Sequence, residues 1–264
     1  MKKVLLASML GVVLAAVPAF AQETLGPAGG NVGNLEGAFT AALPALGFPV
    51  ALIDTTTTAP SVFEVGMAAT YVTNGGCVYF GLLQANYGLM DGLQLSANMP
   101  LVVGEGLVTG NGDLNLDVLW ACLAEQGNMP SVGIGGGVRL PTGEGFTGYD
   151  GRIVGAMTKT LGQARLHFNA GYTTIGNRSL GVRNDADVFA LGMDYPILDN
   201  LVLVGELISQ EAPVEGADRW EFVEGGVRAA LTDTDTLSAG VAVGIGNGNA
   251  TPDFMATVGY QKAM

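Results

Sequence analysis

Apolar and polar residues alternate along most of the chain with a period of two, which is the pattern of β-strands. Over residues 131–140, for example, Val132, Ile134 and Val138 alternate with glycines and with Arg139. Successive side chains of a strand point to opposite faces, so one face of each strand is apolar and the other is polar or small. The apolar face is the inner one in a soluble sandwich and the outer one in a transmembrane barrel.

The pattern predicts twelve strands. Each is close to the 9–11 residues that a tilted strand needs to cross a membrane, and the number is even, as in bacterial single-chain barrels. The predicted ranges are 62–73, 76–89, 92–103, 113–126, 131–141, 151–161, 163–174, 185–197, 200–210, 219–231, 235–246 and 252–261.

The connections alternate between short turns and longer polar loops, as at the periplasmic and external ends of an outer-membrane barrel. Most aromatic residues on the apolar faces fall into two bands, as expected at the two lipid–water interfaces. We therefore expect an all-β fold, an antiparallel transmembrane β-barrel of the Gram-negative outer-membrane type with about twelve strands. A soluble periplasmic β protein is the alternative.

The N-terminus has the features of a secretory signal. Lys2 and Lys3 precede an apolar run, and Ala19-Phe20-Ala21 is a small-x-small cleavage site. We expect residues 1–21 to be a signal peptide and 62–264 to be the barrel in the outer membrane. Residues 22–61, rich in Gly, Pro and Thr, could lie in the periplasm or plug the barrel.

Charge and cysteine content narrow the functional classes. The chain has 24 Asp and Glu residues against 11 Lys and Arg residues, a net charge of −13, which disfavours nucleic acid as a partner. Cys77 and Cys122 fall on apolar faces of strands that are not neighbours. We therefore favour two small apolar residues over a disulfide.

The polar faces would line the interior of the barrel. A charge facing lipid at mid-depth costs up to roughly 2–4 kcal/mol, so charged residues should face water or each other. Opposed charges could form a selective constriction, or they could only hold a closed barrel rigid. The candidate lumen-lining residues are Asp113, Asn115, Asp117, Arg139, Lys159, Arg165, His167, Asp194, Glu206, Glu224 and Arg228.

Other chemistry has weaker support. His167 is the only histidine, and no serine partner for nucleophilic catalysis is evident. Asp113, Asn115 and Asp117 have the spacing of a calcium loop but lack its glycine turn and distal glutamate. We therefore expect no catalytic residues, no metal and no cofactor.

Three short motifs carry a family resemblance. Gly112-Asp113-Leu114 begins one strand, Leu140-Pro141-Thr142-Gly143 ends another, and Gly148-Tyr149-Asp150 follows a polar loop. With the later Gly225-Gly226-Val227-Arg228, the chain resembles the outer-membrane transporter barrels of the MetA-pathway of phenol degradation family, over roughly residues 63–260. It departs from such barrels by ending on Gln261-Lys262-Ala263-Met264 rather than on an aromatic residue.

The resemblance implies a transporter that takes up small compounds. We expect an outer-membrane channel for passive uptake of small solutes, with aromatic or hydrophobic compounds as candidates. The alternative is a structural or surface-interaction barrel with a closed lumen. The expected partners are outer-membrane lipid and lipopolysaccharide, the barrel assembly machinery and a small-molecule solute.

Overall fold

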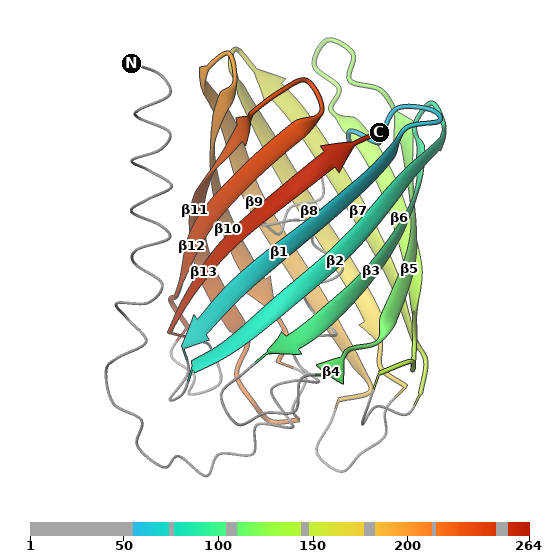
Figure 1. Cartoon of the computed structure of the whole chain (residues 1–264), viewed down its shortest axis with the longest axis vertical. Coiled ribbons are helices and arrows are strands. Elements are labelled where there is room, and N and C mark those ends of the chain that lie inside the picture. The colour runs from blue at the N-terminus through green and yellow to red at the C-terminus, as the bar shows by residue number, and fades with distance from the viewer. Residues whose placement is uncertain are drawn as a thin grey trace.

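Antiparallel strands form a closed ring in the computed structural model (Figure 1). The structure describes residues 55–73, 77–103, 110–143, 148–176, 183–212, 215–246 and 253–264. The predicted signal peptide and residues 22–54 lie outside them. The strands are β1 (Phe63–Thr73), β2 (Cys77–Met90), β3 (Leu93–Val103), β4 (Gly110–Asn111), β5 (Leu114–Leu123), β6 (Ser131–Leu140), β7 (Asp150–Leu161), β8 (Ala164–Thr174), β9 (Asp185–Leu198), β10 (Leu201–Gln210), β11 (Trp220–Ala230), β12 (Asp235–Gly244) and β13 (Phe254–Ala263).

The ring closes between its first and last strands. β1 pairs with β2 on one side and with β13 on the other, from Glu64 opposite Ala263 to Thr73 opposite Phe254. The other long strands pair with their neighbours in sequence, and the two-residue β4 pairs only with β3. A closed sheet leaves no unpaired edge among its long strands, which is one solution to the edge-strand problem. The predicted antiparallel barrel of twelve long strands is confirmed.

The strand ends agree with the predicted ranges within a few residues, except at the end of β5. A register shift between Ala121 and Leu123 ends this strand early. The turn that follows contains Gly127, and the β2–β3 and β7–β8 turns contain Gly92 and Gly162. All three glycines have positive φ, which glycine adopts without steric cost. We call this end of the barrel, which also holds the C-terminus in Figure 1, the turn end, and the opposite end the loop end.

The outer face is apolar and exposed. Ile153 is 58% and Trp120 56% exposed, and large aliphatic side chains of most other strands share this face. Phe63 and Tyr87 lie opposite each other at the turn end, while Tyr172 lies near the loop end. A band of exposed apolar residues around a closed sheet is the lipid-facing surface of a membrane barrel. No helix in the described part of the chain is long and apolar enough to cross a membrane.

The inner face is mainly polar on one side and partly apolar on the other. Buried polar residues belong mostly to β2, β3 and β5–β9, including Asn86, Asn98 and Asn169. The loop-end half of β10–β13 and β1 carries apolar residues on the inner face. They are Val72, Ile208, Trp220, Phe222, Ala242 and Met255.

Candidate functional site: the barrel interior

The first interior cluster holds the loop end together. Arg139 on β6 lies between two carboxylates, with Nη1 2.8 Å from Asp113 Oδ2 and Nε 2.7 Å from Asp150 Oδ2. The second oxygen of Asp113 accepts the backbone N–H of Gly143, and that of Asp150 accepts the N–H of Gly176, each at 2.8 Å. The three charged side chains are at most 4% exposed. These bonds hold the start of the loop after β6, at Gly143, and the start of the loop after β8, at Gly176, to the loop end of the barrel.

A second cluster spans three strands. Arg152 on β7 donates two hydrogen bonds to Asp117 on β5, across β6. The residue between them is Gly137, which pairs with both. A Cβ at this position would lie 1.9 Å from Asp117 Oδ1, so glycine is what allows the ion pair to cross the strand. Asn98 donates a hydrogen bond to Asp117, and Asn115 accepts one from Arg152. The two carboxylates that have the spacing of a calcium loop are therefore each paired with an arginine, Asp113 with Arg139 and Asp117 with Arg152.

A third cluster gathers near the turn end around Asp194. Its Oδ2 lies 3.5 Å from Arg228 Nη1, 3.9 Å from Arg165 Nη1 and 3.4 Å from His167 Nε2. The other ring nitrogen of His167 lies 3.0 Å from the hydroxyl of Thr158. The cluster therefore places two arginines and a histidine around one buried carboxylate.

Two glutamates lie on β10 and β11, beside the Asp194 cluster. Glu206 on β10 and Glu224 on β11 lie directly opposite each other in the strand register, and Glu206 is 4% exposed. A Cβ on the neighbouring Gly240 would lie 2.8 Å from Glu224 Oε1. Glycine thus gives this carboxylate its space, as Gly137 does for Asp117.

Lys159 corrects the expected lumen-lining set, because it lies on the outer face. It pairs with Leu166 and belongs to the same face of β7 as Met157 and Leu161. Its ammonium group bonds Glu125 Oε1 at 2.7 Å, in the β5–β6 turn. Hydrogen bonds from Lys159 and then from Thr160 lower the pKa of Glu125 to about 2. A lysine near a strand end can extend its ammonium group to the polar boundary of the membrane, so an outward position does not bury the charge in lipid.

Sequence reasoning missed Arg152 and Asp150, although both lie in strong ion pairs. The signal was available, because Arg152 has the opposite parity to Lys159 and the same parity as Val154, which is buried inside. The run of glycines on the inner face of β6 also leaves space for side chains from both neighbouring strands.

Residues 55–60, which we call the strap, lie inside the mouth of the barrel at the turn end. Thr55 Oγ1 bonds Ser131 Oγ at 2.7 Å. Three residues later, the hydroxyl oxygen of Thr58 lies 2.9 Å from Glu64 Oε2 and 2.9 Å from Gln94 Oε1, within hydrogen-bonding distance of both. Both threonines are buried. This part of the predicted N-terminal segment is therefore attached to the inner wall, and the remainder of that segment up to residue 54 lies outside the described residues.

The strap rests on a glycine. Pro60 bridges to Gly88 on β2, and Ser61 donates its N–H to the Gly88 carbonyl at 2.8 Å. A Cβ on Gly88 would lie 2.0 Å from the carbonyl oxygen of Ala59. A larger residue there would push the strap off the wall.

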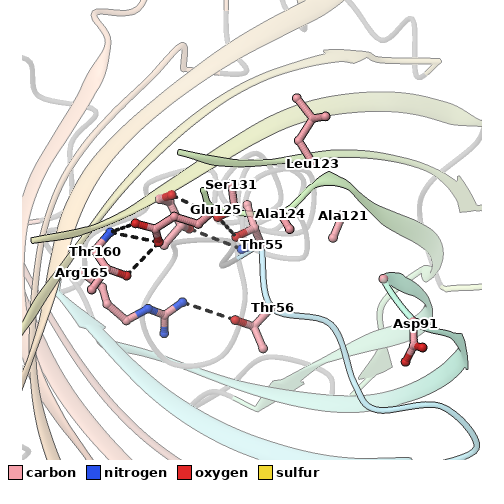
Figure 2. Close-up of a pocket in the computed structure, with 12 residues that line it drawn as sticks. Thr55, Thr56, Asp91, Ala121, Leu123, Ala124, Glu125, Ser131, Thr160 and Arg165 are labelled. Carbon is pink, nitrogen blue, oxygen red and sulfur yellow. Dashed lines mark hydrogen bonds between the residues drawn. The ribbon is translucent and has the colours of Figure 1, made fainter. Parts of the chain in front are cut away.

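A cavity of about 550 Å³ adjoins the strap (Figure 2). Figure 2 shows Arg165 reaching towards Thr56, whose hydroxyl accepts its Nη2 hydrogen bond at 3.3 Å. Five of the residues that line the cavity, Thr55, Thr56, Ser131, Thr158 and Thr160, carry a hydroxyl group. The cavity is therefore suited to water and to polar solutes.

Cys122 has a free thiol that donates to the carbonyl of Val132 at 3.3 Å. The side chain of Cys77 lies outside the described residues, so the expectation for this pair stays a prediction.

Three solved structures, of the two porins NanC and KdgM, are similar to this barrel. The NanC porin has a TM-score of 0.57 at 12% identity over 75% of this chain and 98% of that chain. The chain has the outer-membrane β-barrel fold. A KdgM porin has a TM-score of 0.51 at 13% identity over 75% of this chain and 98% of its own. KdgM in complex with disordered oligogalacturonate has a TM-score of 0.55 at 10% identity, over 76% and 98%.

No family model and no curated protein matches the chain. At the identities of the solved porins, the similarity establishes the fold alone. It confirms the expected Gram-negative outer-membrane class of barrel.

Proposed function

We propose that this protein is an outer-membrane channel that admits small solutes passively. The observation that carries the proposal is the contrast between the two faces of the closed sheet. The outer face is apolar and exposed, while the inner face carries ion clusters from the loop end, at Arg139, to the turn end, at Asp194. Charged side chains held in fixed positions along a lumen are how pores select solutes.

The resemblance to the MetA-pathway family suggests aromatic or hydrophobic compounds as the solutes. The apolar inner surface near the loop end supports this narrower proposal, because Trp220, Phe222 and Met255 lie there on the inner face of the barrel. Aromatic side chains provide large apolar contact areas for such ligands.

We propose no catalytic role. Thr158, His167 and Asp194 do form a hydroxyl–imidazole–carboxylate row. However, Thr158 is 2% exposed, and the backbone N–H of Thr55 points to its hydroxyl oxygen at 3.5 Å. A nucleophile must be within reach of the substrate carbon, and this hydroxyl is covered by the strap.

We further propose outer-membrane lipid, lipopolysaccharide and the barrel assembly machinery as partners. The apolar outer band supports the lipid contact. Ion pairs near the loop end, such as Arg219 with Asp187 and Arg183 with Glu211, support a contact with charged lipid headgroups. The net charge of −13 disfavours nucleic acid as a partner.

A closed structural barrel is the competing function. The strap and the ion pairs that cross between strands both favour it, because they occupy the lumen.

Single-channel conductance of the refolded protein in a planar bilayer separates the two functions. We expect conductance steps, and we expect Glu206→Gln with Glu224→Gln to weaken the preference for cations, because these carboxylates face the lumen. Leu207→Ala, next to Glu206 but on the outer face, is the matched control. Silence of a correctly folded barrel would support the closed structure.

A further inference from the structure

The strap runs across part of the opening at the turn end, from one part of the barrel wall to another. Thr58 is attached to Glu64 and Gln94, on β1 and β3. Thr55, three residues earlier, is attached to Ser131 on β6, and Thr56 to Arg165 on β8. Three residues span at most about 10 Å, so the strap passes directly from one part of the wall to the other.

The cavity beside the strap lies at the turn end. The strap forms one side of it, and the β2–β3 turn and the ends of β5–β8 form the rest, with charged residues Asp91, Glu125 and Arg165 in the lining. Its volume of about 550 Å³ is within the range of pockets that hold small molecules. A solute that passes this cavity must be no larger than the opening that the strap leaves.

We propose that the strap sets the size limit for solutes at the turn end, with small polar molecules passing beside it. Its attachments are of two kinds. The Thr58–Pro60 half is anchored by charged and amide side chains and by the Gly88 backbone, whereas Thr55 bonds the hydroxyl groups of Ser131 and Thr158 and Thr56 bonds Arg165. The inference rests on the proposed channel function.

A reversible crosslink tests the proposal in the full chain. The variant carries Thr55→Cys and Ser131→Cys, whose hydroxyl oxygens are 2.7 Å apart, in a background with Cys77→Ala and Cys122→Ala. We expect reduction of the disulfide to raise single-channel conductance about twofold or more, because pore diameter governs passage. Liposome swelling should then admit larger uncharged oligosaccharides.

The matched control is Thr70→Cys with Thr257→Cys in the same background. These hydroxyl oxygens are 3.0 Å apart on β1 and β13, away from the strap. Reduction should leave its conductance unchanged. Equal conductance of the oxidised and reduced strap variant, in a protein that conducts, would overturn the strap proposal and leave the channel proposal intact.

Gly88→Val provides a second test that needs no disulfide. Its side chain would collide with the carbonyl oxygens of Thr58 and Ala59, so it should displace the strap and raise both conductance and the size limit. Gly225→Val, where a Cβ meets nothing within 4 Å, should change neither. An unchanged Gly88→Val channel would overturn the proposal, and silence of every folded variant would overturn the channel function with it.

Discussion

Replacing Arg139 by methionine should destabilise the barrel strongly. The substitution keeps a long side chain but leaves the carboxylates of Asp113 and Asp150, which are 0% and 4% exposed, without their shared counter-ion. Each retains one backbone N–H, from Gly143 and Gly176. Removing one partner of a buried ion pair typically costs about 3–5 kcal/mol, and we expect a loss of unfolding free energy in that range.

Most of this loss should return in the triple variant Arg139→Met, Asp113→Asn, Asp150→Asn. The amide oxygens can still accept the N–H groups of the two loops, and no uncompensated charge remains. The effect is therefore attributed to the unpaired charges rather than to the missing arginine side chain.

Urea unfolding of the protein folded in lipid vesicles measures the effect, with the fluorescence of Trp120 and Trp220 as the signal. The urea dependence of the unfolding free energy should not change, because the same surface is exposed on unfolding. Arg219→Met is the control, since its ion pair with Asp187 is 35% exposed on both sides. Such a pair should be worth at most about 1 kcal/mol. A loss below about 1 kcal/mol for Arg139→Met, or a triple variant no more stable than the single one, would refute the reasoning.

Two further predictions concern side-chain fit and pH. Gly137→Ala should lower the unfolding free energy by about 1–3 kcal/mol, because its Cβ would displace the Asp117 carboxylate, whereas Gly225→Ala should have little effect in the same urea titration. The contact between Glu125 and Lys159 should persist in mild acid. A lowered folded-state pKa gives stability that is fully present above the ordinary glutamate pKa of 4.5 and is lost as the pH falls through about 2. The difference in urea midpoint between the wild type and Glu125→Gln should therefore remain at pH values near 5, and its disappearance there would contradict this assignment.

Alternation predicted the barrel well because parity is a local property of each strand. Val138 and Arg139 fall on opposite faces whatever the neighbouring strands do, and the structure places them so. Trp220 and Phe222 have the parity opposite to that of most other aromatic residues, and the structure buries both on the inner face.

Partner choice was less predictable, because it depends on register and on neighbouring side chains. Lys159 was expected inside as a charged strand residue, but its position at a strand end allows an outward contact with the Glu125 turn. Arg152 reaches Asp117 only because Gly137 lies between them in the register. The sequence of one strand does not show which residues of the neighbouring strands lie beside it.

The strap was unpredictable for a different reason. Its run of threonines has the composition of a linker, and its position depends on contacts with residues such as Ser131 and Arg165, more than seventy positions away. Short polar side chains can form hydrogen bonds with water or with the inner face of a barrel. A run of threonines therefore does not distinguish an exposed linker from an attached segment.

The seam between β1 and β13 has a consequence for the speed of folding. Thr70 and Thr257, whose hydroxyls meet across this seam, are 187 positions apart, whereas the other long strands pair with close neighbours in sequence. Contacts between residues that are distant in sequence form slowly, because the chain loses the entropy of loop closure before these contacts can stabilise it. The hairpins can form early and the ring shuts last. Until then, the edges of β1 and β13 expose unpaired backbone groups, and the half-made sheet is most prone to aggregate at that stage.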